Sequence, residues 1–176
     1  MIGYIALALF AATIPAANWL IGNVGTMCIP QGPCLIPVGF GLMAPSGVLM
    51  VGAALVLRDI VHERLGVYWA IGAVLLGGML SAFFASPALA IASTLAFLLA
   101  EGADLAVYAP LRKRHLSWAV LLSGIAGAII DSAFFLWLAF GSLSLIEGQI
   151  VGKLWMSLLA AAGLVSVRAL KKEPHP

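Results

Sequence analysis

The sequence predicts an all-α integral membrane protein, a single bundle of six transmembrane helices with no soluble domain. Two observations lead to this fold class. Hydrophobic residues make up 63% of the 176-residue chain and charged residues only 9%, whereas soluble domains carry roughly 25% charged residues. A helix needs about 20 apolar residues to cross the hydrocarbon core, and the apolar runs leave no room for anything else. Residues 1–176 are therefore expected to form one transmembrane domain.

The six helices are located by the segments that separate them. Gly/Pro-rich or charged stretches are costly in hydrocarbon, so they mark the ends of the apolar runs. Residues 1–21 lack the basic start and the small-residue cleavage site of a secretory signal, so they count as a spanning helix. Helices are expected at residues 2–21, 35–57, 67–85, 88–108, 116–140 and 149–168.

The second of these runs is irregular in its first half. Its segment "PVGFGLMAPSG" contains Pro37 and Pro45, and proline removes a backbone hydrogen-bond donor. This predicts a kink or an unwound section near Pro45. Non-helical backbone at membrane depth survives only when it is buried in protein or lines a cavity, so a simple proline kink and the wall of a ligand path both fit.

The basic residues predict the orientation of the bundle. Eight of the nine lysines and arginines fall on one side, which the positive-inside rule makes cytoplasmic. Both termini are then cytoplasmic. The net charge of +2 is spread over three short segments, which gives no indication of nucleic-acid binding. The eight residues are Arg58, Arg64, Arg112, Lys113, Arg114, Arg168, Lys171 and Lys172.

Two cysteines lie in the outward loop that this arrangement predicts. Cys28 and Cys34 bracket "IPQGP", and an oxidising compartment would permit a disulfide that pins the loop between the first two helices. The sequence leaves open whether this bond forms. No histidine lies nearby and the spacing matches no zinc or iron–sulfur site, so we expect no metal and no cofactor.

Several polar side chains lie inside the predicted spans. A charge near the bilayer centre costs several kcal/mol, so such residues usually face the bundle interior and mark a substrate or ion path. Three acids stand against one base, which indicates a donor-rich or cationic ligand, or one protonated acid. Alternatively, Lys153 pairs with Asp131 or Glu101 and locks the bundle. The polar residues are Asn18, Glu101, Asp104, Asp131, Gln149 and Lys153.

Aromatic side chains accompany the acids at helical spacing. Together with the carboxylates they describe a pocket for a flat, polar molecule, with ring faces for stacking and a few polar groups for orientation. A guanine-like ring fits, because its two parallel N–H donors suit a carboxylate and its carbonyl suits a lysine or an amide. The aromatic residues are Phe97, Tyr108, Phe134, Phe135 and Trp155.

Four segments carry a family resemblance: "LRDIVHERLG", "DLAVYAPLRKR", "SGIAGAIIDSAFFLWLAF" and "GQIVGKLW". From about Asn18 to Trp155 the chain resembles the queuosine precursor transporter family, also called the vitamin uptake transporter (VUT) family. The most specific elements are Asp-Ser-x-Phe-Phe from Asp131, Asp-x-x-x-Tyr from Asp104 and Gln-x-x-x-Lys from Gln149. Gly124 departs from the pattern, since an asparagine is expected there.

The resemblance implies a multi-pass importer in the bacterial inner membrane. Its substrate would be a 7-deazaguanine that feeds tRNA queuosine modification, chiefly 7-cyano-7-deazaguanine (preQ0), with the aminomethyl form as a second candidate. The substrate-binding residues would be Asn18, Glu101, Asp104, Tyr108, Asp131, Phe134, Phe135, Gln149 and Lys153.

The segment "RDIVHERLG" has two interpretations. Asp59 and Glu63 lie four residues apart on one helix face, next to His62. They form either a solvated helix end closed by Gly66 or a cytoplasmic gate or proton path, in which His62 would titrate near neutral pH.

Two rival functions remain to be weighed. A substrate-binding subunit of an energy-coupling-factor transporter is also a small six-helix protein, and Ala8, Ala12 and Ala16 would allow close approach to a partner helix. An intramembrane enzyme is not expected, because the Gly-x-Gly-Asp signature is absent and His62 and His115 fall outside the spans. Exact substrate, driving force and oligomeric state, a homodimer included, stay open.

Overall fold

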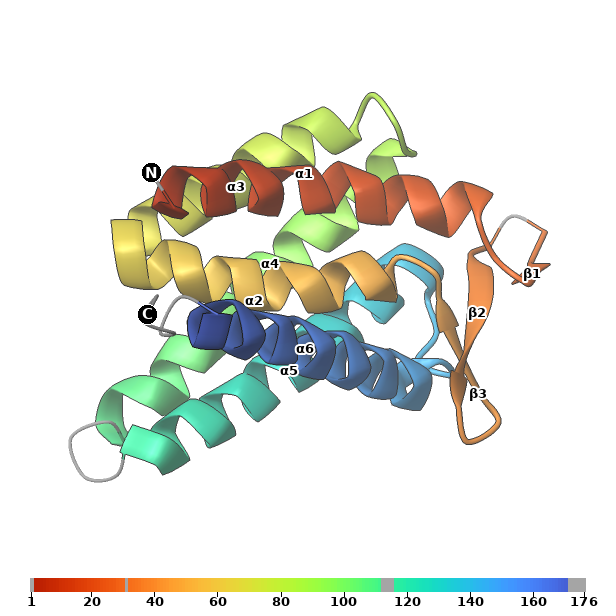
Figure 1. The fold of residues 1–176 in the computed structure, drawn as a ribbon. Helices are drawn as coiled ribbons and strands as arrows, with labels where there is room; N and C mark the ends of the chain where they lie inside the picture. The colour runs from red at the N-terminus through yellow and green to blue at the C-terminus, as the bar shows by residue number, and fades with distance from the viewer. Residues whose placement is uncertain (1, 31, 112–115, 171–176) are drawn as a thin grey trace.

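The computed structural model describes residues 2–30, 32–111 and 116–170. These residues form six helices and a small antiparallel sheet (Figure 1). The helices are α1 (Ile2–Asn23), α2 (Val48–Leu65), α3 (Val67–Ser81), α4 (Pro87–Leu111), α5 (Leu116–Phe140) and α6 (Ile146–Leu170). The strands are β1 (Met27–Cys28), β2 (Cys34–Gly39) and β3 (Leu42–Pro45), in the order β1-β2-β3.

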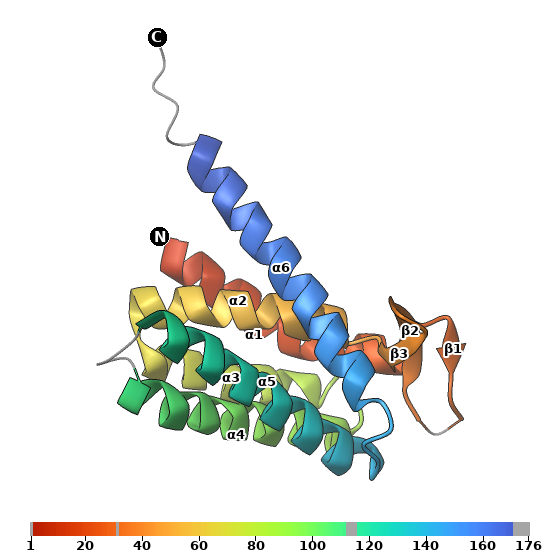
Figure 2. The same ribbon diagram turned by 90° about the horizontal axis from the view of Figure 1, so that it is seen from below.

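The helices run back and forth between two ends of a bundle. α1 begins and α6 ends at the same end, where α2 also turns into α3 and α4 approaches α5 (Figures 1 and 2). The sheet and the α3–α4 and α5–α6 connections lie at the other end. Arg64 lies in the last turn of α2, at the end where α2 turns into α3 (Figure 1), and the orientation of the bundle in a membrane stays a prediction.

Three helices of the described chain are long and apolar enough to cross a membrane by length and composition. They are α1, α4 and the Leu122–Phe140 part of α5, and α3 is a shorter apolar helix. Large apolar side chains also point outward from the bundle, among them Leu95, Ile125 and Leu154. An outward apolar surface of this extent suits lipid rather than water. That all six helices span the membrane stays a prediction.

The helix expected at residues 35–57 is wrong in its first half. β2 and β3 form a hairpin there, with Leu35 opposite Pro45 and Pro37 opposite Met43, and α2 begins only at Val48. The two prolines remove backbone donors that a helix would need. Gly39 and Gly41 have φ of 98° and 74°, which glycine adopts at little cost and which a helix excludes. The predicted unwinding near Pro45 therefore extends over the whole segment.

The remaining helix boundaries differ by a few residues. The helix expected at 67–85 ends at Ser81, and those expected at 88–108 and 149–168 are longer, as α4 and α6. Pro87 begins α4 because a proline suits the first helical position, and the Ser86 hydroxyl accepts from the Leu89 N–H at 3.3 Å as a cap. Gly66 alone separates α2 from α3, with φ of 96°.

The hairpin is held against the bundle by α6 and α1. Trp155 Nε1 donates to the Val38 carbonyl at 3.1 Å, and Ser46 Oγ donates to the Leu20 carbonyl at 2.8 Å. Val38, Ala44 and Val48 form a small buried cluster beneath it. Cys28 and Cys34 form a disulfide that ties β1 to β2. The hairpin thus closes one end of the bundle.

Replacing Gly148 with alanine is expected to destabilise the packing of α6 against the hairpin. A Cβ at Gly148 would overlap the Met43 carbonyl oxygen, which is backbone and cannot rotate away. Overpacking of this kind costs about 1–3 kcal/mol, so thermal unfolding of the purified protein should begin at a lower temperature. Gly72→Ala in α3 is the control, because its Cβ would meet open space. Equal unfolding temperatures of Gly148→Ala and Gly72→Ala would contradict this packing.

Candidate functional site

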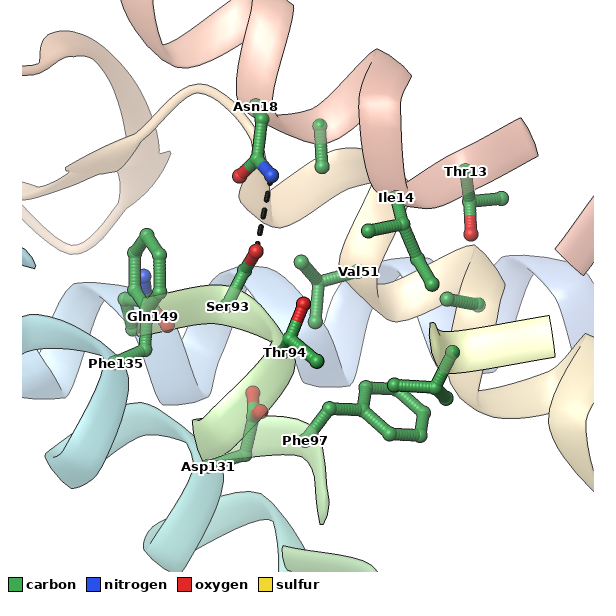
Figure 3. Close-up of a pocket in the computed structure, with 13 residues that line it drawn as sticks. Thr13, Ile14, Asn18, Val51, Ser93, Thr94, Phe97, Asp131, Phe135 and Gln149 are labelled. Atoms are coloured by element: carbon green, nitrogen blue, oxygen red, sulfur yellow. Dashed lines mark hydrogen bonds between the residues drawn. The ribbon is translucent and has the colours of Figure 1, made fainter. Parts of the chain in front are cut away.

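A small enclosed cavity of about 40 Å³ lies inside the bundle (Figure 3). All six helices contribute to its wall, so its shape depends on how they pack. Its lining residues are Thr13, Ile14, Ala17, Asn18, Val51, Ala54, Val74, Ser93, Thr94, Phe97, Asp131, Phe135 and Gln149. Four of the sequence-predicted binding residues therefore meet here: Asn18, Asp131, Phe135 and Gln149.

A buried ion pair holds Asp131 at the cavity. Lys153 is 2% exposed, and its Nζ donates to Asp131 Oδ2 at 2.5 Å and to Ser132 Oγ at 2.6 Å. The Ser132 hydroxyl donates onward to the Ala128 carbonyl at 2.8 Å. A buried charge that lost its partner would cost several kcal/mol. Of the two pairings considered from the sequence, the structure therefore has Lys153 with Asp131.

The hydrogen bonds of Ser93 determine which end of the Asn18 amide faces it. The Ser93 hydroxyl donates to the Ala90 carbonyl at 3.1 Å, and a hydroxyl has only one hydrogen to give. Ser93 must therefore accept from Asn18, whose Nδ2 lies 2.9 Å away. The amide oxygen of Asn18 then points away from Ser93, as Figure 3 shows. Asn18 lines the cavity and keeps its amide oxygen as an acceptor that Ser93 does not use.

The other hydroxyls of the cavity wall also donate their hydrogens to backbone carbonyls. Thr94 Oγ1 donates to the Ala90 carbonyl at 2.8 Å and Thr13 Oγ1 to the Phe10 carbonyl at 2.6 Å, as is usual for these residues inside helices. Their remaining lone pairs are acceptors. Together with the Asp131 carboxylate and the Asn18 oxygen, they make the polar part of the cavity rich in acceptors.

Gln149 is the exception, because its amide has donors to offer. The residue is 2% exposed, lines the cavity and makes no side-chain hydrogen bond with any described residue. A buried amide without partners costs free energy, so its position in the wall favours a ligand that supplies them. The complementary ligand has several N–H groups and at least one oxygen or nitrogen acceptor.

Five more of the predicted residues lie at a second, open cleft of about 520 Å³, whereas Glu101 and Lys153 line neither space. This cleft belongs to the end of the bundle where α2 meets α3. Asp104 and Tyr108 line it together with the predicted gate residues Asp59, His62 and Glu63. Phe134 lies in neither place and packs against the apolar cluster around Phe135. The single pocket that the sequence predicted is thus two separate spaces.

Arg58 was expected in the segment between two helices, and this position is wrong. α2 continues to Leu65, so Arg58 is only 11% exposed by its side chain, and its Nη1 donates to Glu101 Oε2 at 2.8 Å. Arg58 also bonds the exposed Asp59. The sequence did not reveal this, because the buried helix face that Arg58 shares with Ala54 and Val61 becomes visible only in the structure.

Arg58 adds a second base to the three buried acids and one base that the sequence predicted inside the bundle. Glu101 bonds Arg58 directly and Asp131 bonds Lys153. Asp104 is 9% exposed and interacts with Arg58 electrostatically, without a direct hydrogen bond or salt bridge to it. Among the described residues no group of three His, Cys, Asp or Glu side chains could hold a metal ion.

Replacing Lys153 with methionine is expected to destabilise the protein by about 3–5 kcal/mol, because it leaves Asp131 buried without its cation. Lys153→Met combined with Asp131→Asn removes both charges and should recover most of the loss. Thermal unfolding of the wild type, the single variant and the double variant measures this. A single variant as stable as the wild type would contradict the pairing.

Residues 73–167 match the protein family described as "Putative vitamin uptake transporter". This stretch is more than half of the chain and contains Asp104, Asp131, Gln149 and Lys153. No curated protein and no solved structure matches the chain. The family and the apolar helices α1, α4 and α5 together indicate a membrane transporter. The chain belongs to the vitamin uptake transporter family.

Proposed function

We propose that the protein imports a 7-deazaguanine base, with 7-cyano-7-deazaguanine as the main substrate, and so supplies tRNA queuosine modification. The observation that carries this proposal is the acceptor-rich wall of the enclosed cavity. Such a base has three kinds of N–H donor, at N1, at the exocyclic amine and in the pyrrole ring. Asp131 would accept from the first two in parallel, in the way carboxylates accept from paired donors.

The rest of the base finds partners in the same cavity. The carbonyl of the base suits the Gln149 amide, and the Asn18 oxygen suits a further N–H. Phe135 and Phe97 line the cavity beside Asp131 and offer ring surfaces for stacking. Each polar group of the wall then has a counterpart on the ligand, which is what a buried polar site requires.

Anionic vitamins suit this wall poorly. A ligand carboxylate or phosphate would lie against the Asp131 carboxylate, and like charges in a buried site repel strongly. Lys153 does not line the cavity, and its charge is already paired with Asp131. A neutral, N–H-rich heterocycle is therefore the better substrate class.

Binding requires the cavity to expand. Ligand pockets are typically about 300 Å³ or larger, whereas the cavity measures about 40 Å³. α6 diverges from α4 and α5 toward its C-terminal end (Figure 2), and the hairpin closes the other end. A transporter that alternates between two openings would separate these helices around the ligand.

A second candidate function is a substrate-binding subunit of an energy-coupling-factor transporter. Ala8 and Ala12 are exposed on α1 and Ala16 is half-buried, so the small-residue face of α1 is free to pack against a partner helix. Uptake by the chain expressed without any ATPase module separates the two functions, since such a subunit would not transport alone.

The proposal includes the orientation of the bundle in the membrane. The end of the bundle with Arg58, Arg64 and the open cleft would face the cytoplasm of a bacterium, as the positive-inside rule requires. Both termini would be cytoplasmic, and the disulfide of Cys28 and Cys34 would lie outside, where oxidising conditions maintain it.

Asp131→Asn is expected to abolish import. The test host can neither make nor import 7-cyano-7-deazaguanine, and queuosine in its tRNA is the readout. The wild-type chain should restore queuosine from added 7-cyano-7-deazaguanine, and Asp131→Asn should not, because an amide cannot accept the two parallel N–H bonds.

Two further variants control for folding and charge. Lys153→Met with Asp131→Asn should insert and remain stable yet stay inactive. Glu147→Gln removes an exposed carboxylate at the start of α6 and should import normally. Normal import by Asp131→Asn would contradict the proposal, and restoration by a different vitamin alone would change the substrate.

Ser93→Ala is expected to weaken substrate binding without abolishing transport. The change removes the acceptor that orients Asn18, so the KM for uptake should rise by roughly three- to tenfold, the effect of one hydrogen bond, with the maximal rate nearly unchanged. Ser142→Ala is the matched control, because Ser142 is exposed and bonds only Ser144 and its N–H. An unchanged KM in Ser93→Ala would show that Asn18 does not contact the ligand.

A further inference from the structure

The carboxylate and ring of the enclosed cavity have a counterpart in the open cleft. Asp131 and Phe135 lie four residues apart on α5, and Asp104 and Tyr108 lie four apart on α4. Residues at this spacing share one helix face, and each pair lines one of the two spaces. α4 and α5 pack side by side in opposite directions (Figure 2). The two pairs therefore lie toward opposite ends of the same helix pair.

Asp104 is the residue that favours a ligand site in the cleft. It is nine-tenths buried and lines the cleft with Arg58, with which it interacts electrostatically but makes no direct hydrogen bond or salt bridge. A carboxylate in this setting is costly unless donors from a ligand or from water reach it. The other two buried acids, Glu101 and Asp131, each have a cation. Of the three buried acids, Asp104 is thus the one whose carboxylate is not directly bonded to a cation, so its oxygens can accept from a ligand.

The size of the cleft also suits a ligand. Its volume of about 520 Å³ falls within the roughly 300–1,000 Å³ of small-molecule pockets. Tyr108 and Leu105 give it apolar surface beside Asp104. An aromatic heterocycle with paired N–H donors would meet the same combination of carboxylate and ring as in the enclosed cavity.

A salt bridge separates the two spaces. On α2, Ala54 lines the cavity and Arg58 lines the cleft; on α4, Phe97 lines the cavity and Asp104 the cleft. Glu101 lies between Phe97 and Asp104 on α4 and bonds Arg58. The Arg58–Glu101 pair therefore stands at the boundary, and a ligand that passed from one space to the other would have to displace it.

We propose that the open cleft is a second binding station for the same N–H-rich heterocycle, with Asp104 accepting its donors and Tyr108 lying against its ring. This inference rests on the proposed function. The base would leave the enclosed cavity past the Arg58–Glu101 pair and occupy the cleft before release. Transport through two stations divides one long passage into two shorter steps.

Equilibrium binding of 7-cyano-7-deazaguanine to the purified full-length protein in nanodiscs tests this. Two classes of site are expected in the wild type. Asp104→Asn should weaken one class by about tenfold or more, because a charge-assisted hydrogen bond becomes a neutral one. Asp131→Asn should remove the other class. Glu147→Gln, which removes an exposed carboxylate that lines neither space, should leave both classes unchanged.

Tyr108→Leu keeps every charge and most of the side-chain volume, so it tests the cleft even if Asp104→Asn fails to fold. It should weaken the same class as Asp104→Asn. A single class of site that is lost in Asp131→Asn and unchanged in Tyr108→Leu would overturn the second station and leave the proposed function intact. Absence of any binding to the folded wild type would overturn both.

Discussion

The ion pair between Lys153 and Asp131 is the interaction on which the rest of the bundle depends. Each charge alone would be costly inside a membrane protein, and together they are tolerated because Ser132 completes the hydrogen bonds of the ammonium. The pair joins the middle of α5 to the start of α6. Gly148 and Gly152, on the same turn of α6, lie directly against the hairpin. The position of the hairpin, the depth of α6 and the carboxylate at the cavity therefore share one cause.

The chemistry of the cavity depends on hydroxyl groups in its wall whose hydrogens already bond backbone carbonyls of the helices. Ser93, Thr94 and Thr13 each return their hydroxyl hydrogen to a carbonyl of the preceding turn, which is the usual arrangement for a hydroxyl in an apolar helix. Their lone pairs are left for a ligand, and Ser93 turns the Asn18 amide so that it too offers an oxygen. The preference for donor-rich ligands thus comes from backbone geometry as much as from Asp131.

Much of this could be predicted from the sequence. Hydropathy indicates the helices, and the cost of charge in hydrocarbon indicates that Asp131, Lys153 and Asp104 face inward. Three features could not be predicted. Pro37 and Pro45 show where a helix fails but not that a hairpin replaces it. Arg58 was taken for a surface marker because basic residues usually mark helix ends, and only the length of α2 reveals it as buried. Ser93 and Thr94 left no signal, since a hydroxyl costs little in an apolar helix.

The two buried ion pairs differ in their partners, and this difference bears on how the boundary between cavity and cleft can open. Lys153 bonds the buried Asp131 and Ser132, and removing Lys153 or Asp131 leaves a buried charge without its partner. Arg58 divides its donors between Glu101 and Asp59, whose side chain is 66% exposed. Glu101 keeps one oxygen without a partner among the described residues. Breaking the Arg58–Glu101 bond leaves Arg58 with Asp59 but leaves the buried Glu101 carboxylate without a partner among the described residues. A ligand that passed this boundary would therefore have to donate to Glu101 as it displaced Arg58, and an N–H-rich heterocycle has the donors to do so.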